Sequence, residues 1–224
     1  MSTLLRLSKI DPQTRVDHSQ LDVSDEGNIY YWREYTARRD YSFSATNNLI
    51  KNFKITPAQK RASPSRSRHK ERALNVLALE VAKIIIPTVL HHPGTIVPIP
   101  PSKMPGDPDH DDRIMRLLKK ASGNSAADIR PVVVHTQNTA ADHEGAHRLT
   151  FGERLAITGL DRSLLLPAPK WAVIFDDILT NGTHYKVAKT LLAAAWPNVT
   201  ITGVFIARRV QPPVDFSDSR NLDV

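Results

Sequence analysis

The chain has 224 residues, 41% of them hydrophobic, and it has no cysteine, which excludes disulfides, thiolate metal sites and a cysteine nucleophile. Its formal charge of +7 favours polyanionic partners, a class that includes phosphorylated small molecules and nucleic acids. The first residues lack the pattern of a signal peptide, and no apolar run reaches the roughly 20 residues of a membrane span. We therefore expect a cytoplasmic protein that does not enter a membrane.

Residues 1–66 hold half of the aromatic side chains, and this content argues against a disordered tail. Ser44 or Thr46 is suited to cap a helix, because a hydroxyl accepts hydrogen bonds from free backbone N–H groups. We expect this segment to form an aromatic and basic hood or appendage on a main domain at 67–224. The side chains that would line a short strand or hairpin in it are Tyr30, Trp32 and Tyr35.

The segment from Lys51 to Arg72 is a cluster of positive charge, with eight lysines and arginines against Glu71 alone. Its middle part is rich in Pro, Ser and basic residues, which is typical of a linker or mobile loop. Such a cluster is either a solvated face or a contact surface for nucleic acid phosphates. The sequence leaves both interpretations open.

The remaining residues alternate between strand and helix patterns, which predicts an α/β fold with a mostly parallel twisted sheet and helices on both faces. Arg208 and Arg209 end the last strand, and we expect them to face solvent rather than a ligand. In chain order the pattern predicts a helix from His69 to Pro87, a strand at 95–99, a helix opening with the acids of 107–112, a strand at 130–135, a strand from 171 to the acid pair, a helix at 183–195 and a strand at 198–210.

Two adjacent acids, Asp176 and Asp177, follow the apolar run of the third strand and precede a polar loop and a helix. Parallel sheets bind ligands at the carboxyl ends of their strands, and helix N-termini favour phosphate, so this stretch is the candidate site. Adjacent buried acids repel each other unless cations or hydroxyl donors meet them, which makes a simple turn the weaker interpretation. The chain has neither a GxxxxGK[ST] nor a GxGxxG motif, so the usual P-loop and dinucleotide sites are discounted.

The stretch VIFDDILTNGTHYKVAKTLL resembles the motif with which type I phosphoribosyltransferases bind phosphoribosyl diphosphate (PRPP). The resemblance implies that Asp176 and Asp177 contact the ribose hydroxyls. It also implies a loop around the 5-phosphate, and Asn181 and His184 are departures from the hydroxyl residues usual in that loop. The residues of this loop are Thr180, Asn181, Gly182, Thr183 and His184.

A second segment, GTIVPIPPSK, resembles the pyrophosphate loop of the competence-protein-F-like members of this family. The resemblance implies that Pro101, Ser102 and Lys103, together with Pro100, contact the pyrophosphate. A third segment, at 137–150, corresponds to the loop that closes over the site in these relatives. Arg148 is its candidate cation, with two histidines beside it, His143 and His147; a surface loop with incidental histidines is the alternative.

These resemblances imply a phosphoribosyltransferase that uses Mg²⁺ and transfers the phosphoribosyl group to or from a nitrogenous base or amine. The catalytic candidates are Asp176, Asp177, Lys103 and Arg148, and Mg²⁺ is expected mainly through the ligand, with no metal site formed by protein residues alone. The acceptor would be bound by the hood through aromatic residues such as Tyr41.

Two other functions stay open. The chain is alternatively a non-catalytic sensor of PRPP or a nucleotide, or a nucleic-acid-associated protein that contacts phosphates through residues 51–72. The aromatic N-terminal third is similar to phosphoribosyltransferase-type effectors of bacterial defence units such as retrons, which implies a role in antiviral defence. A homo- or hetero-oligomer is compatible with each of these functions.

Overall fold

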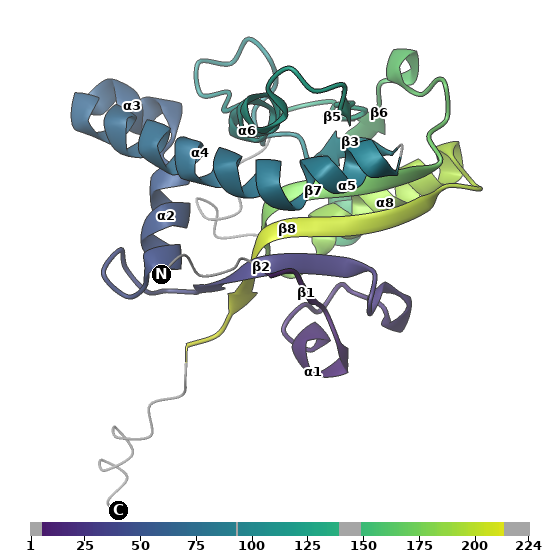
Figure 1. Cartoon of the computed structure of the whole chain (residues 1–224), viewed down its shortest axis with the longest axis horizontal. Coiled ribbons are helices and arrows are strands. Elements are labelled where there is room, and N and C mark those ends of the chain that lie inside the picture. The colour runs from purple at the N-terminus through teal and green to yellow at the C-terminus, as the bar shows by residue number, and fades with distance from the viewer. Residues whose placement is uncertain (1–5, 93, 139–148, 213–224) are drawn as a thin grey trace, which may run out of the picture.

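A computed structural model describes residues 6–92, 94–138 and 149–212 of the chain. In this part, six strands form one sheet in which only β1 runs antiparallel to its neighbour (Figure 1). The predicted α/β fold with a mostly parallel sheet is therefore confirmed. From edge to edge the strands are β1 (Ser8–Lys9), β2 (Ile29–Thr36), β8 (Thr200–Val210), β7 (Trp171–Leu179), β3 (Thr95–Pro98) and β4 (Asp128–Ile129).

Helices pack against both faces of the sheet, and each face has its own hydrophobic cluster. One face carries α2 (Ala45–Phe53), α4 (Pro64–Ile84), α5 (Ile86–His91) and α6 (Arg113–Ser122). The other face carries α8 (Thr183–Ala195), and Figure 1 shows α4 and α8 on opposite sides of the central strands. Shorter elements are α1 (Pro12–Arg15), α3 (Pro57–Ala62), α7 (Phe151–Ala156), β5 (Val133–His135), β6 (Thr158–Leu160) and single 3₁₀ turns at Val23–Asp25 and Arg162–Leu164.

The central strand β7 is buried along nearly its whole length, as its continuous apolar run predicts for a strand covered on both faces. Ile174 and Phe175 have no exposed surface and belong to the clusters on opposite faces. The α8 helix follows after a short loop and occupies the predicted range. These elements form the frame of the candidate site.

The basic segment at 56–70 is largely helical, so its prediction as a linker or mobile loop is wrong. Thr56 caps α3 by accepting from the N–H of Gln59, and Pro64 occupies the first turn of α4, where its missing N–H leaves no bond unmade. Pro87 likewise lies in the first turn of α5. The sequence predicted that the helical region ends at Pro87, but α5 continues to His91. A proline at a helix start is compatible with the fixed φ of its ring.

Two further predictions, on the segments before and after α6, are wrong. The acids at 107–112 precede α6 instead of opening it, because their carboxylates bind other partners, such as Arg61 for Asp109. The strand at 130–135 does not join the main sheet: β5 pairs antiparallel with β6 in a separate ribbon. The edge position beside β3 is taken by β4, a two-residue strand.

The N-terminal aromatic segment contributes β2, which pairs in parallel with β8 inside the main sheet. Trp32 is buried against Phe175 at a ring distance of 6.5 Å, and its indole donates to Glu80 at 2.8 Å. Ser44 caps α2 by accepting from the N–H of Asn47 at 3.0 Å, as one of the two predicted caps. The division of the chain at residue 66 stays a prediction.

The helical stretch Pro64–His91 is long and apolar enough to pass a hydropathy test for a membrane-spanning helix. Half of its most apolar window is buried inside the protein, where Leu77 and Val81 of α4 have no exposed surface. A core helix passes the same test, so this finding is weak support for a membrane span.

The chain leaves β3 and β7 in opposite directions. After β3 it passes through α6 to β4 at one edge, whereas after β7 it passes through α8 to β8 on the other side. The two crossover helices lie on opposite faces, so a crevice opens between the carboxyl ends of these adjacent strands. This is the position at which open α/β sheets bind their ligands.

Candidate functional site

A cavity of about 190 Å³ lies at the carboxyl ends of β3 and β7. Its wall combines the loop after β3 with the acid-pair stretch, two segments that are far apart in the sequence. Of the predicted site residues, those that line this cavity are Pro100, Pro101, Ser102, Lys103, Asp176, Asp177, Thr180 and His184.

The acid pair lies inside β7 and not at its end, because the strand continues to Leu179. On one side β8 pairs with β7 as far as Leu179, opposite Arg208. On the other side β3 pairs only as far as Phe175, so the strand edge opens at Asp176. Since successive side chains of a strand point to opposite faces, Asp176 and Asp177 meet different partners.

Asp177 is buried and ion-paired on the face that carries α2 and α6. Arg113, the first residue of α6, donates from Nε and Nη2 to Oδ2 of Asp177 at 2.9 and 2.8 Å. Lys54, at the end of α2, donates from Nζ to Oδ1 at 3.3 Å. Both oxygens of this carboxylate therefore accept from cations.

This pairing keeps Asp177 ionised. Burial alone would raise the pKa of Asp177, but Lys54 and Arg113 outweigh it and hold that pKa well below the ordinary value of 3.8. Burial also acts to lower the pKa of Arg113, and Asp177 and Asp111 outweigh it, so that pKa is raised. The two side chains thus stay charged and fixed relative to each other.

The ion pairing continues into the core. Arg113 donates from Nη1 to Asp111 at 3.1 Å, and Lys70 donates from Nζ to both oxygens of Asp111 at 2.8 and 2.7 Å. Lys70 is 1% exposed; burial lowers its pKa, and Asp111 opposes that shift. We call this row of alternating charges the buried charge chain; its members are Lys54, Asp177, Arg113, Asp111 and Lys70.

Asp176 has a different environment on the α8 side. Its Oδ1 accepts the N–H of Asp177 at 2.7 Å, and its Oδ2 lies 3.8 Å from Nδ1 of His184 in the first turn of α8. Within the described ranges, no lysine or arginine forms a salt bridge with Asp176. This carboxylate is therefore the one of the pair that remains suited to accept from ligand hydroxyls.

The predicted phosphate loop turns at Gly182, which has a φ of +92° and forms the N-cap of α8. A Cβ at this position would lie 2.7 Å from Cδ2 of Leu21, so both the backbone conformation and the packing require glycine. Asn181 accepts the N–H of Thr183 with its side chain at 3.2 Å. Asn181, Gly182 and Thr183 do not line the cavity in this structure.

The same loop is fixed from outside by the N-terminal segment. The carbonyl of Thr180 accepts from Nδ1 of His18, and the carbonyl of Asn181 accepts the N–H of Gln20 at 2.9 Å. His18 has no exposed surface, and burial is the main cause that lowers its pKa. A neutral His18 therefore ties a distant segment to the loop that precedes α8.

The loop after β3 also has fixed geometry. The carbonyl of Lys103 lies 2.7 Å from Nδ1 of His110, and the N–H of Met104 donates to Asn138 at 2.7 Å. Lys103 thereby sits at the wall of the cavity that also contains Asp176. The loop provides backbone groups and one cation to the space next to the acid pair.

Several side chains of the cavity were not among the predicted site residues: Lys54, Arg113, His135 and Arg154. Lys54 belongs to the basic cluster noted in the sequence, but nothing there indicated a partner for it. Arg113 follows a run of acids, which is the available signal for an ion pair. Arg154 is buried, an unusual place for arginine, and only tertiary structure reveals this.

Two predictions concern arginines. Arg148, like His143 and His147, lies outside the described residues. Arg208 does not face solvent: it donates to Glu34 at 3.0 and 2.6 Å and to Asp17 at 3.0 Å. Glu34 is its register partner on β2, and Asp17 comes from the segment after α1.

A second cavity of about 220 Å³ adjoins the first on the α6 side. Its wall includes apolar side chains such as Met104, Ile114 and Val133, and it shares Lys103 and Asp176 with the first cavity. The charged space above the acid pair thus opens onto an apolar one, a combination typical of small-molecule sites.

Comparison with known proteins adds no family to this description. The sequence matches no protein-family model, and it matches no curated protein sequence at a significant level. The structure by itself shows an α/β protein with a mostly parallel six-strand sheet and helices packed against it.

Proposed function

We propose that the chain is a phosphoribosyltransferase-like protein that binds PRPP, or a related pentose phosphate, with Mg²⁺. One observation carries the proposal: the two segments that resemble the pyrophosphate and PRPP motifs line one cavity at the switch point of the sheet. The two segments lie far apart in the sequence. They line one cavity because the strand order of the sheet places β3 beside β7, as such a site requires. The proposed reaction is transfer of the phosphoribosyl group to or from a nitrogenous base or amine.

The two acids have separate roles in this proposal. Asp176 accepts from the ribose hydroxyls, because its Oδ2 faces the cavity side of α8 and is not ion-paired with a lysine or arginine of the described residues. Asp177 instead positions Arg113 and Lys54 at the cavity wall. In this proposal the 5-phosphate binds beside Thr180 and His184, the two residues of the predicted phosphate loop that line the cavity, near the N-terminus of α8.

The described residues contain no group of three or more His, Asp or Glu side chains that would hold a metal ion. The donors present fit an ion held mainly by the ligand's own phosphates, with Asp176 as the nearby carboxylate. Bound Mg²⁺ would neutralise charge on the leaving pyrophosphate. From the chain itself, Lys103 provides a fixed cation to the same group, and Pro101 and Ser102 shape the loop around it.

Calorimetric titration of PRPP with Mg²⁺ into the wild-type protein and Asp176→Asn tests this site. The asparagine keeps an oxygen for the N–H of Asp177 but removes the charge, so we expect PRPP affinity to fall roughly 10- to 100-fold. Asp22→Asn is the matched control, since Asp22 is exposed and pairs with Lys186 outside the cavity. Unchanged affinity in Asp176→Asn would contradict the assignment.

Pyrophosphate release separates the enzyme from the alternative sensor. Incubation of the protein with PRPP, Mg²⁺ and a panel of nucleobases and amines is expected to release pyrophosphate with at least one acceptor. Saturable PRPP binding with no release across the panel would instead support a sensor. Asp176→Asn should abolish release in the first case.

A further inference from the structure

A groove of about 740 Å³ runs from the candidate site along the carboxyl edge of β2 and β8. Its walls come from the end of β2, the loop before α2, one side of α2, and the end of β8. It shares Lys54, Thr56, Ile178 and Thr180 with the cavity described above. The groove is therefore continuous with the proposed PRPP site.

The charge of this groove is of one sign. Among the described residues that line it there is no aspartate or glutamate, whereas Arg38, Lys51, Lys54 and Arg209 are all cationic. The cavity, by contrast, contains as many carboxylates as lysines and arginines. A groove lined by cations alone repels cationic ligands and attracts an anion.

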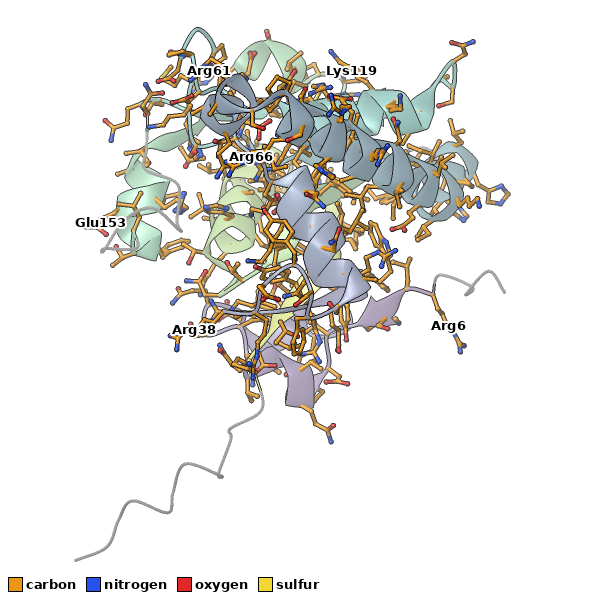
Figure 2. All side chains as sticks on the ribbon, turned by 90° about the vertical axis from the view of Figure 1, so that its left-hand side faces the viewer. Arg6, Arg38, Arg61, Arg66, Lys119 and Glu153 are labelled. Carbon is orange, nitrogen blue, oxygen red and sulfur yellow. The ribbon has the colours of Figure 1, made fainter. Side chains whose placement is uncertain are left out.

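Arg38 combines exposure with an unusual backbone conformation. It is exposed and has a φ of 59°, a left-handed conformation that few residues other than glycine adopt. Figure 2 shows its side chain on the rim of the face that carries α2. Strain of this kind persists where the surrounding structure fixes it, and it is frequent at ligand sites.

Two tyrosines lie among these cations. Tyr41 is 47% exposed, and Nζ of Lys51 lies 5.3 Å from the centre of its ring. Tyr35 lines the same wall; burial, and second the nearby Tyr41, raise its pKa. Exposed aromatic faces beside cations are the elements on which nucleobases stack while phosphates pair.

The cationic surface continues beyond Tyr41. A second hollow of about 740 Å³ shares Tyr41 with the groove and passes between α2 and α4, with Asn52, His69 and Arg72 in its wall. It too has no carboxylate among the described residues that line it. Two hollows meeting at one tyrosine form a path longer than a single nucleotide needs.

We propose that this path, named the Tyr41 groove and comprising both hollows, binds a single-stranded nucleic acid whose end or unpaired base lies next to the cavity. Stacking on the exposed Tyr41 distinguishes a nucleic acid from an acidic peptide, and the hollowed shape favours a single strand over a duplex. That the strand is the acceptor of the phosphoribosyl group rests on the proposed function. The binding itself does not.

The test uses fluorescence anisotropy with labelled single-stranded DNA and RNA of about 12 nucleotides, a length within the range of known single-strand sites. Tyr41→Ala should weaken binding roughly 5- to 100-fold, because it removes one stacking platform. Tyr41→Phe keeps the ring and should bind within about twofold of wild type. Arg38→Ala with Lys51→Ala should lower the slope of log affinity against log salt by about 1.4.

The matched control is Lys119→Ala with Lys120→Ala, which removes the same charge from exposed positions of α6. Lys119 lies at the opposite end of the molecule from Arg38 in Figure 2. Equal loss of affinity in this control, or unchanged affinity in Tyr41→Ala, overturns the proposal. Displacement of the oligonucleotide by polyglutamate at equal charge concentration also overturns it, in favour of an acidic peptide.

The two proposals fail separately. Groove variants should retain calorimetric PRPP affinity, because Arg38, Tyr41 and Lys51 do not line the cavity. Asp176→Asn should retain oligonucleotide affinity for the converse reason. Wild-type protein that binds the oligonucleotide but not PRPP would contradict only the proposed function, and wild-type protein that binds PRPP but not the oligonucleotide would contradict only the groove.

Discussion

The cavity and the Tyr41 groove adjoin at the same edge of the sheet but differ in how their charges are arranged. The cavity has four carboxylates and four lysines or arginines, and half of these eight belong to the buried charge chain. The groove itself has cations without carboxylates among its described lining residues. Carboxylates and cations paired in one wall fix geometry for a small specific ligand, whereas a lining of cations attracts a polyanion with little geometric demand.

The same difference has a consequence for stability. Removing one member of a buried pair leaves an uncompensated charge in the core, which is strongly destabilising. Removing an exposed cation of the groove leaves no uncompensated charge in the core, and it should reduce the repulsion among the cations of the groove. Substitutions in the two regions should therefore separate effects on folding from effects on binding.

The largest effect is expected for Arg113→Met. This change leaves Asp177, whose side chain is 4% exposed, with Lys54 alone at 3.3 Å. We expect the free energy of unfolding in denaturant to fall by about 3–5 kcal/mol. Arg113→Lys keeps the charge but not the two-point contact, so it should recover only part of that loss. A loss below about 1 kcal/mol in Arg113→Met would contradict the structural role of the buried charge chain.

The next largest effect is expected for Gly182→Ala, since the new Cβ would lie 2.7 Å from Cδ2 of Leu21 at a φ of +92°. Gly106→Ala is a close control, because Gly106 has a φ of +93° and nothing within 4 Å of an added Cβ. We expect a loss of about 1 kcal/mol for Gly106→Ala and about 2–3 kcal/mol for Gly182→Ala, measured by denaturant unfolding. Equal losses would show that Leu21 does not fix this loop.

A smaller effect concerns pH. The pKa of Asp177 is lowered in the folded protein, so this group stabilises the fold above the unfolded value of 3.8. Below about pH 4 the unfolded chain binds a proton that the folded chain does not, and stability falls by up to about 1.4 kcal/mol per pH unit. Asp177→Asn should flatten this part of the pH profile of unfolding. An unchanged slope would show that Asp177 does not cause it.

The smallest effect on stability is expected in the groove. Arg38→Gly removes an exposed cation and relieves the strain of a φ of 59°, against the greater chain entropy of glycine. The two terms are similar, so we expect the free energy of unfolding in denaturant to change by about 0.5 kcal/mol or less. Oligonucleotide affinity should nevertheless fall. A large stability loss would remove the contrast between groove and cavity.

The sequence by itself determined the frame of the site. The apolar run before Asp176 and the helical spacing after Gly182 are local patterns, and β7 and α8 occupy the predicted positions. The order of strands and helices likewise predicted a mostly parallel sheet. PRPP binding stays a proposal, because it rests on a sequence resemblance that the fold alone does not test.

Only the tertiary structure decided how the two acids differ. Alternation along β7 sends Asp177 toward Arg113 and Lys54, which lie far away in the sequence, and leaves Asp176 beside His184. The basic segment at 56–70 is largely helical because its prolines fall in first turns and its buried Lys70 pairs with Asp111. Charge partners that lie far apart in the sequence produce no periodic pattern in it. For that reason the sequence alone cannot reveal them.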